Sequence, residues 1–404
     1  MEIRIPKFNT RDILFFLSFS LYMFFSILQI SCFAVYFLGI NKFLMPLCIV
    51  LLLLYEMCNS TMNKRELLGA GLLYFLALWV IWRGGRSQSL AIVFLYAFSA
   101  RNIAFTKIAK VSLIVSSLLL FIILSCSKLG IIPDYTNIRY TLTGIQTRHY
   151  LGFLYVLFGP AIFLNAILLY IYIRKEKIKL AEISAILLLS IWMFSATNAR
   201  LSFLLSILCV MLAIVNKYRK DNYSSLKVIP RMLISSYIAC FAIIFLLTIH
   251  YSPSNQWMLF LDFLLANRLS LSQISIKDYG INLFGSKVEW IGNGLDAFGK
   301  TKVGEYAYLW VDSLYIQILQ RDGVIFTAIF LFIMTLLMYK LYKRRENLLL
   351  IILSVRAVQC MIDSTMQSLR YNTFFLLIGI VFFGYLSKKK IKPDEKSIML
   401  NASE

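Results

Sequence analysis

Long apolar runs recur along almost the whole chain, and they set the strongest limit on how it can fold. Sixty per cent of the residues are hydrophobic and only 15% are charged, which excludes a soluble globular protein. The runs with lengths near the roughly 17 to 25 residues that cross a bilayer as a helix cover 13–40, 43–58, 67–82, 88–104, 110–127, 151–173, 180–195, 201–216, 232–250, 324–340, 347–369 and 373–387. The sequence therefore predicts an all-α polytopic integral membrane protein, one membrane domain over residues 1–404 with about twelve transmembrane helices.

Basic residues on the short connections predict how the chain is oriented. The formal charge is +21, but Lys and Arg alternate from one side of the predicted bundle to the other, as topology markers do, so we expect no nucleic-acid partner. An amino terminus in the cytoplasm places inside the basic residues near 4–11, 64–65, 101–110, 174–179, 217–231, 340–345 and 388–396. An even number of spans returns the carboxyl terminus to the same side. We therefore expect a multi-pass protein of the plasma or inner membrane with both termini cytoplasmic.

Two stretches are too polar to lie in lipid, and this orientation places both outside. The shorter extracytoplasmic loop is 128–150, and the longer is 250–323. Within the longer loop the pattern predicts helices over 256–275 and 311–320, separated by a glycine-bearing middle. We expect these short helices to be interfacial and the two loops to form a polar working surface.

Several familiar chemistries are not indicated. The seven Cys are scattered, mostly within apolar runs, without a CxxC pair or a Cys/His cluster, so we expect neither a disulfide framework nor a metal site, and no cofactor. Gly294, Gly299, Lys300 and Thr301 match the phosphate-loop pattern GxxxxGK[ST]. No hydrophobic strand of a βαβ unit precedes them and the loop is expected outside, so we do not expect a nucleotide site.

The eleventh run carries five polar residues at helical spacing. Steps of three and four residues, which place side chains on one face of a helix, separate Arg356, Gln359, Asp363, Gln367 and Arg370. An Arg or Asp at mid-membrane costs about 2.5 to 3.5 kcal/mol, so this face must point into the bundle or a wet cavity. The face is either functional or an interhelical ladder that only holds helices together.

Arginines at the outer ends of spans and in the outer loops form the second polar signal. A guanidinium can clamp a phosphate bidentately, and the candidates for binding a diphosphate or a glycan are Arg83, Arg86, Arg139, Arg148, Arg200 and Arg268, with Arg356 and Arg370 as weaker ones. The alternative is that they snorkel toward lipid headgroups. His149 is a candidate general base, although a lone surface histidine is more often only solvated.

Short motifs in a consistent order give the chain a resemblance to a known family. The pieces that carry it are Arg148-His149-Tyr150-Leu151-Gly152-Phe153, Asn198-Ala199-Arg200, Asn267-Arg268-Leu269, Tyr279-Gly280-Ile281-Asn282-Leu283-Phe284-Gly285, Ile291-Gly292-Asn293-Gly294, Asp312-Ser313-Leu314-Tyr315 and Tyr371-Asn372-Thr373-Phe374-Phe375-Leu376. The chain resembles the O-antigen and capsular polysaccharide polymerases of the Wzy type, particularly those of Gram-positive exopolysaccharide and capsule pathways.

The resemblance implies a GT-C-like, O-antigen ligase-like helical bundle and a metal-independent glycosyltransferase. Such an enzyme joins undecaprenyl-diphosphate-linked oligosaccharide repeat units at the outer membrane face and releases undecaprenyl diphosphate. Partners would be the lipid-linked repeat, the bilayer, and a flippase and chain-length regulator of the same pathway. The arginines would neutralise the departing diphosphate, and His149, Asp312 or Asp363 would be the catalytic base.

The sequence is also compatible with two other functions. A ligase would transfer the finished glycan to a lipid or protein acceptor, and it would share the general layout of a polymerase. A flippase or other transporter of lipid-linked oligosaccharides would also have about twelve spans, although transporters often show related halves, and no repeat is visible in this sequence.

Overall fold

A computed structural model describes residues 10–58, 64–84, 89–141, 144–218, 228–301 and 307–384, and these residues are mostly helical. The first eight helices are α1 (Thr10–Leu28), α2 (Asn41–Cys58), α3 (Lys64–Gly84), α4 (Ser89–Ser99), α5 (Phe105–Lys128), α6 (Phe158–Arg174), α7 (Leu180–Thr197) and α8 (Arg200–Tyr218). The others are α9 (Val228–Leu233), α10 (Ser236–Ile249), α11 (Gln256–Leu264), α12 (Arg268–Tyr279), α13 (Leu314–Arg321), α14 (Gly323–Lys343), α15 (Asn347–Cys360) and α16 (Leu377–Phe383).

The length and composition of the helices fit a membrane protein. Within the described ranges, α5, α7, α14 and α6 extended by the 3₁₀ turn after it (Phe158–Lys177) are each long and apolar enough to cross a bilayer, and α11 with α12 would count as a fifth span if that bent pair is one. Shorter apolar helices lie in α1, α3, α8, α10 and α15 and over Thr373–Phe383. Large apolar side chains point outward from the bundle, with Phe121 70% and Leu188 67% exposed, which suits a lipid environment.

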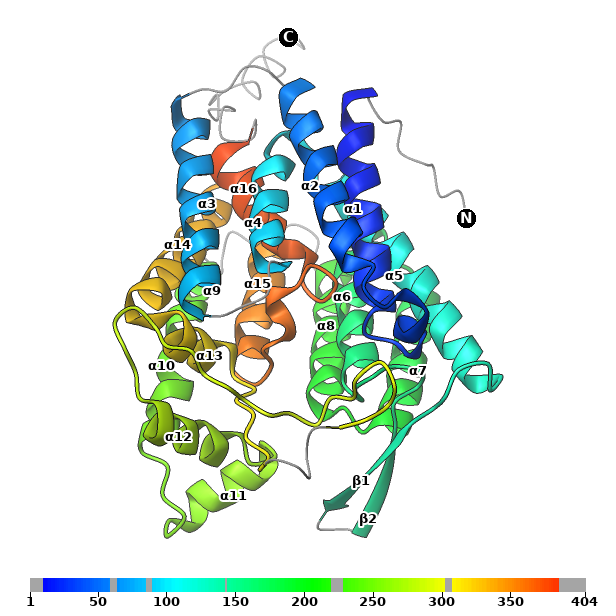
Figure 1. Ribbon diagram of the computed structural model, residues 1–404, viewed down its shortest axis with the longest axis vertical. Coiled ribbons are helices and arrows are strands. Elements are labelled where there is room, and N and C mark those ends of the chain that lie inside the picture. Colours follow the sequence, from blue (N-terminus) through cyan, green and yellow to red (C-terminus); the bar gives the residue numbers. More distant parts are fainter. Residues whose placement is uncertain are drawn as a thin grey trace, which may run out of the picture.

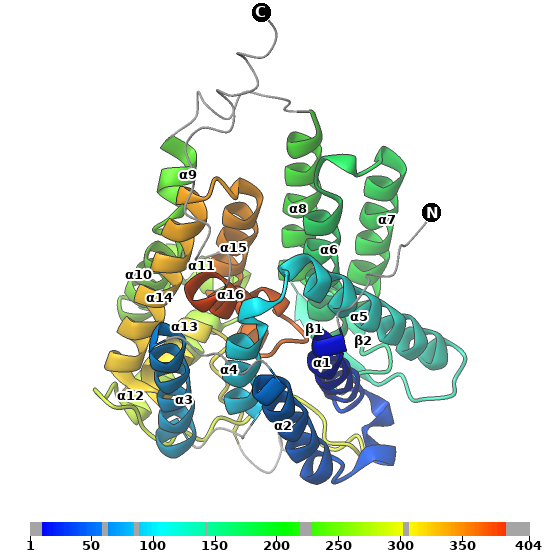
Figure 2. The same cartoon turned by 90° about the horizontal axis from the view of Figure 1, so that it is seen from above.

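The helices form two groups, and the last part of the chain lies between them. On one side α1 packs against α2 and α5, α5 against α6, and α6 and α7 against α8; on the other α3 packs against α4, and α10 against α14 and α15. Figure 2 shows α10, α14 and α15 on one side and α5 to α8 on the other, with α16 near the middle; α4 also packs against α2 and joins the two groups. In Figure 1 the described chain begins in α1 at the upper end, whereas α11, α12 and a β-hairpin lie at the lower end.

The prediction of one continuous helix over 347–369 is wrong. Helix α15 ends at Cys360, and the chain continues through irregular backbone with two 3₁₀ turns, Thr365–Gln367 and Thr373–Leu376. The Asp363 carboxylate accepts hydrogen bonds from the Thr365 amide at 2.8 Å and its hydroxyl at 2.6 Å, and such local bonds compete with the helix ladder. Only Arg356 and Gln359 of the five polar residues therefore share a helical face.

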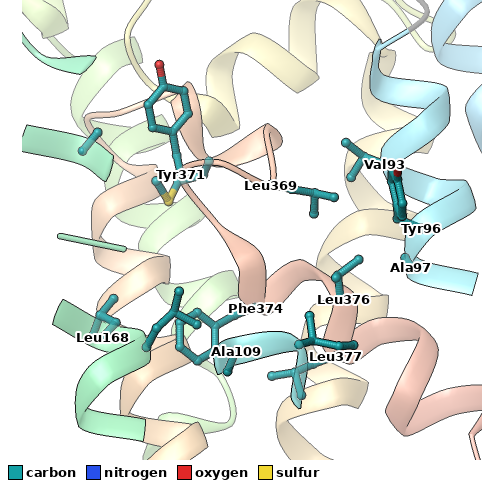
Figure 3. Close-up of a cluster of buried hydrophobic side chains, with 14 of the residues drawn as sticks. Val93, Tyr96, Ala97, Ala109, Leu168, Leu369, Tyr371, Phe374, Leu376 and Leu377 are labelled. Atoms are coloured by element: carbon teal, nitrogen blue, oxygen red, sulfur yellow. The ribbon is translucent and has the colours of Figure 1, made fainter. Parts of the chain in front are cut away.

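The irregular segment fills the centre of the bundle. Figure 3 shows that Tyr371 and Phe374 point in opposite directions from it and that Leu369 points toward α4. Phe374 is fully buried against Phe105 of α5, with ring centroids 5.4 Å apart. Apolar packing on both sides fixes this non-helical backbone at the depth where most helices are continuous, and non-helical backbone at membrane depth is tolerated only where protein surrounds it or a cavity is lined.

The shorter loop contains β structure that the sequence did not predict, within a chain that is otherwise mostly helical. Strands β1 (Thr136–Thr141) and β2 (Gly144–His149) form an antiparallel hairpin in which Asn137 pairs with Arg148. Thr, Ile and Tyr in β1, and Ile and Thr in β2, alternate with polar residues, a composition that favours β structure. The hairpin presents Arg148 on one face and its neighbour His149 on the other.

The helix predicted over 256–275 is two helices. Helices α11 and α12 meet at a bend of 103°. Ala266 and Asn267 between them have positive φ angles of 58° and 63°, which end the first helix. The buried Asp262 carboxylate then accepts hydrogen bonds from the amides of Leu269 and Ser270, so it satisfies the free amino end of α12. The second predicted helix, 311–320, is confirmed as α13.

Arg101, expected to be an exposed topology marker, is buried. Its side chain is 1% exposed and donates two hydrogen bonds of 2.7 Å to the two carboxylate oxygens of Glu56 on α2. Glu66 on α3 lies 3.9 Å from its Nε atom, and its guanidinium lies 4.0 Å from the ring centre of Phe98. This arginine therefore joins three helices by a buried ion pair.

Candidate functional site

The centre of the candidate site is an ion pair between Arg268 and Asp312. The Arg268 Nε atom donates a hydrogen bond of 2.7 Å to Asp312 Oδ2, and Nη1 donates to the Leu265 carbonyl at 3.3 Å. Both side chains are less than one-fifth exposed. These contacts leave Nη2 of Arg268 without a protein partner among the residues that the structure describes, so it can donate to a bound anion.

The bend after α11 places Arg268 in this position. Arg268 is the first residue of α12, and its N-cap Asn267 has a left-handed conformation. Asp312 directly precedes Ser313, whose side chain caps the start of α13. Two helix starts that are 44 residues apart in sequence thus present opposite charges to each other.

Two tyrosines lie near the ion pair, and a second arginine, Arg148, lies near one of them. Tyr155 lies near enough to Asp312, Tyr308, Arg268 and Arg148 for their charges to act on its hydroxyl. Burial, reinforced by the charge of Asp312, raises the pKa of Tyr308 to about 12, so this phenol stays protonated and can donate a hydrogen bond.

Burial also raises the pKa of Asp312 above its ordinary value, although Arg268 opposes the shift. The nearby charge of Asp363 acts in the same direction as burial. Asp363 itself is held by the two bonds from Thr365 and by one of 3.0 Å from Gln359 Nε2. The structure therefore brings Asp363 to the ion pair, although not along the helix face that its spacing predicted.

Arg356 and Arg370 belong to an interior polar network next to the site. Arg356 is fully buried and donates to Asn165 on α6 and to Gln359 at 2.7 Å each. Arg370 donates to the Ser26 carbonyl at 2.9 Å, and the Asn165 side chain donates to the Arg370 carbonyl at 3.5 Å. For Arg356 these contacts favour the structural alternative, because its charged group binds protein partners inside the bundle.

Arg148 is anchored beside the turn between α7 and α8. Its Nε atom donates to the Thr197 carbonyl at 2.8 Å, at the carboxyl end of α7. Asn198 ends α7 in a left-handed conformation and donates a hydrogen bond to Gln146 of the hairpin. Arg200 begins α8 two residues later and is half-buried. The hairpin and this turn thus bring two of the predicted arginines close together.

His149 forms a separate pair on the opposite face of the hairpin. Its Nδ1 atom lies 2.8 Å from Asp134 Oδ2, and its side chain is 43% exposed. Nε2 of the imidazole makes no hydrogen bond within the described part of the chain. A histidine that is held at one nitrogen and open at the other has the arrangement of a general base.

The structure does not place the side chains of three predicted site residues. Arg86 falls outside the described residues, and the side chains of Arg83 and Arg139 are not described. No cluster of three or more His, Cys, Asp or Glu side chains that could hold a metal ion occurs in the described ranges.

In the segment that matches the phosphate-loop pattern, the backbone amides donate hydrogen bonds to the segment's own Asp296 side chain. Asp296 Oδ1 accepts hydrogen bonds of 2.9 Å from the amides of Phe298 and Lys300, amides that a phosphate loop would offer to a nucleotide. The segment is a tight turn in which Leu295 bridges to Thr301. Its geometry therefore does not fit a nucleotide site.

Sequence reasoning missed four residues of the site. Tyr155 follows the Arg148–Phe153 motif closely enough for its neighbourhood to have suggested a role, whereas Asp134 is brought to His149 only by the folded hairpin. Asn165 is a polar residue in the apolar run 151–173, and an isolated polar group at membrane depth marks a structural or functional contact. Tyr308 carried no such signal, because only the folded loop brings it to Asp312.

No family model, curated protein or solved structure matches this chain. Its fold and site define a polytopic helical membrane protein with a cluster of arginines, aspartates and tyrosines built from the hairpin, the bent pair α11–α12 and the segment before α13.

Proposed function

We propose that this protein is a polysaccharide polymerase that joins undecaprenyl-diphosphate-linked oligosaccharide repeat units at the outer face of the cell membrane and releases undecaprenyl diphosphate. The observation that carries the proposal is the Arg268–Asp312 pair with its unengaged guanidinium Nη2, beside two tyrosines, one of which also lies near Arg148. The motif resemblance described above supplies the substrate class.

The proposal includes the finer topology. About twelve spans, short ones included, cross the membrane, with both termini in the cytoplasm and the loops 128–150 and 250–323 outside. A lipid-linked repeat that has been flipped presents its diphosphate at that outer face, where the arginine cluster lies under this orientation. A flippase and a chain-length regulator would act before and alongside the polymerase.

Separate residues bind the diphosphate and transfer the proton. A glycosyl diphosphate is already activated, so the protein supplies charge neutralisation, orientation and a base. Arg268 and Arg148 bind the leaving diphosphate, with Arg200 and Arg370 beside them, and Tyr308 donates a hydrogen bond to it. Asp312 is occupied by Arg268, and Asp363 by three donors, whereas His149 is open at Nε2. We therefore assign His149 as the base that takes the proton of the acceptor hydroxyl; it lies on the hairpin face opposite Arg148, so the acceptor sugar would approach from that side.

An in vitro polymerisation assay tests this function. Purified protein in proteoliposomes receives lipid-linked repeat units extracted from cells that lack the protein, without any second acceptor. A polymerase makes a ladder of products, whereas a ligase does not. Arg268→Ala should abolish the ladder, because it removes the diphosphate clamp, and leave single repeats.

A matched control is available on the same helix. Lys277 is an exposed cation in the last turn of α12, so Lys277→Ala should leave the ladder unchanged. Normal chain length in both Arg268→Ala and Arg148→Ala, at an unchanged membrane level, rules out the assignment of these arginines.

A further inference from the structure

The carboxylate of Asp134 binds two groups of the hairpin's carboxyl end at once. Its Oδ2 atom lies 2.8 Å from His149 Nδ1, and its Oδ1 atom accepts a hydrogen bond of 2.7 Å from the Leu151 amide. Each oxygen therefore contacts a different group, and the carboxylate cannot rotate without breaking both contacts.

The backbone around Asp134 is tied down independently. The Tyr150 amide donates to the Tyr135 carbonyl at 2.9 Å, and the Cys32 amide donates to the Gly152 carbonyl at 2.8 Å. Leu151 is 1% exposed and has a φ angle of 54°, a conformation that bulky residues rarely adopt. Such a conformation persists only where the surroundings enforce it, and it is common at functional sites.

From this geometry we infer that Asp134 is a positioning residue that fixes His149 in one tautomer, with the proton on Nδ1 and the lone pair on Nε2. This inference rests on the proposed function. Nε2 accepts the proton when the O–H bond of the acceptor hydroxyl breaks. The hydroxyl oxygen bonds to the anomeric carbon, and the bond from that carbon to the diphosphate oxygen breaks, so its electron pair leaves with the diphosphate.

Substituting Asp134 with Asn tests the inference without changing the shape of the side chain. The Leu151 amide needs an acceptor, so the Asn oxygen must face Leu151 and its NH₂ group must face His149 Nδ1. Nδ1 then accepts a hydrogen bond, and the proton moves to Nε2. The variant should therefore fold normally and hold the imidazole in the wrong tautomer.

The two histidines of the chain make this tautomer measurable. In a His250→Gln background, ¹⁵N-histidine labelling leaves the signals of His149 alone, and the ¹⁵N shifts of Nδ1 and Nε2 show which nitrogen carries the proton. The ladder assay gives the rate on the same samples. Asp278→Asn, which neutralises an exposed carboxylate on α12, is the matched control.

The inference predicts an inverted tautomer in Asp134→Asn and a rate lower by about a hundredfold or more, the usual contribution of a general base. The KM for the lipid-linked donor should be unchanged, because the arginines are intact. An unchanged tautomer overturns the positioning role of Asp134. An inverted tautomer at full rate overturns His149 as the base. The proposed polymerase function would still stand in that case, provided that Arg268→Ala abolishes the ladder.

Discussion

At the scale of single residues, the shape of the Arg268 side chain matters as much as its charge. Arg268 uses Nε for Asp312 and Nη1 for Leu265, so only a planar fork can hold these contacts and still offer a donor to the diphosphate. Arg268→Lys keeps the charge and should weaken the binding of undecaprenyl diphosphate about tenfold or more, since hydrogen bonds to charged groups contribute about 1.5 to 3 kcal/mol. Microscale thermophoresis in detergent measures the affinity for undecaprenyl diphosphate. Equal affinity in the variant would contradict the role of Arg268 in binding the diphosphate.

The raised pKa of Asp312 sets an acid limit for the site, meaning the pH below which ligand binding weakens. The charged carboxylate pairs with Arg268, and burial disfavours that charged form. The pair is therefore intact above the raised pKa and is lost as pH falls through it, at a higher pH than for an exposed aspartate. Binding of undecaprenyl diphosphate should weaken over that range in the unmodified protein.

The phosphates and His149 also titrate, so the comparison needs a variant that lacks only the carboxylate. Asp312→Asn should bind weakly at all pH values, and the ratio of the two affinities should change with pH. A constant ratio from pH 4 to pH 8 would show that Asp312 does not set the acid limit.

Single residues also show how far the sequence could predict the site. Arg148 and Arg268 were identified because each lies at or near the outer end of a predicted span, and Asp312 because its motif carries the family resemblance. Their mutual contacts could not be predicted, because they depend on the bend at Ala266 and Asn267 and on two helix starts far apart in sequence. Asp134 was missed since its role exists only through the hydrogen bonds of the folded hairpin.

At the scale of elements, the long loop returns to the bundle through two glycines that touch. Gly323 has a φ angle of 92°, and a Cβ atom there would lie 2.3 Å from the Gly285 nitrogen. Gly323→Ala should therefore separate the loop from the start of α14 and destabilise the protein by about 2 kcal/mol or more. Thermal unfolding followed by tryptophan fluorescence measures this change.

Gly294 is the matched control for that substitution. A Cβ atom at Gly294 would meet nothing within 4 Å, and no unusual φ angle is required there. Gly294→Ala should unfold at the same temperature as the unmodified protein. If both variants behave alike, the close approach of the two glycines is not what holds the loop.

The buried ion pair between α2 and the end of α4 should be sensitive to the loss of either partner. Glu56→Gln leaves the buried Arg101 cation without its main partner, and breaking a buried pair in this way costs about 3 to 5 kcal/mol. The pair of Lys107 and Asp12 is partly exposed, with 31% and 21% of the side chains accessible, so Asp12→Asn should cost under about 1 kcal/mol. Unfolding temperatures compare them, and equal losses would argue against the buried pair.

Two elements show which parts of the fold could not be predicted from the sequence pattern. Apolar runs predicted where most of the helices lie, because membrane-depth helices must be apolar along their length, although only four or five helices of the described chain are long enough to span a membrane. The prediction failed over 347–369, where the spacing of Arg356, Asp363 and Arg370 fits a helix that local hydrogen bonds of Asp363 interrupt. The hairpin was expected only as a loop, because its six-residue strands give too short a signal beside the apolar runs.

At the scale of the whole molecule, the proposed function depends on which side of the membrane holds the arginine cluster. The hairpin, α11 and α12 lie at one end of the molecule, opposite the start of α1 (Figure 1). Under the proposed orientation, a cysteine at an exposed position of the long loop should react with an impermeant maleimide in intact cells. Lys287 is 77% exposed at the side chain and supplies that position. Lys177, in the connection between α6 and α7, supplies the opposite one.

The experiment needs a background without a competing thiol. Cys58 is the exposed cysteine of the described chain, so Cys58→Ser removes the main source of unwanted labelling. In that background Lys287→Cys should label in intact cells, whereas Lys177→Cys should label only after the membrane is broken. The reverse pattern would place the arginines and the ion pair of Arg268 on the cytoplasmic side, away from flipped lipid-linked repeats, and the polymerase proposal would then fail even with every contact of the site intact.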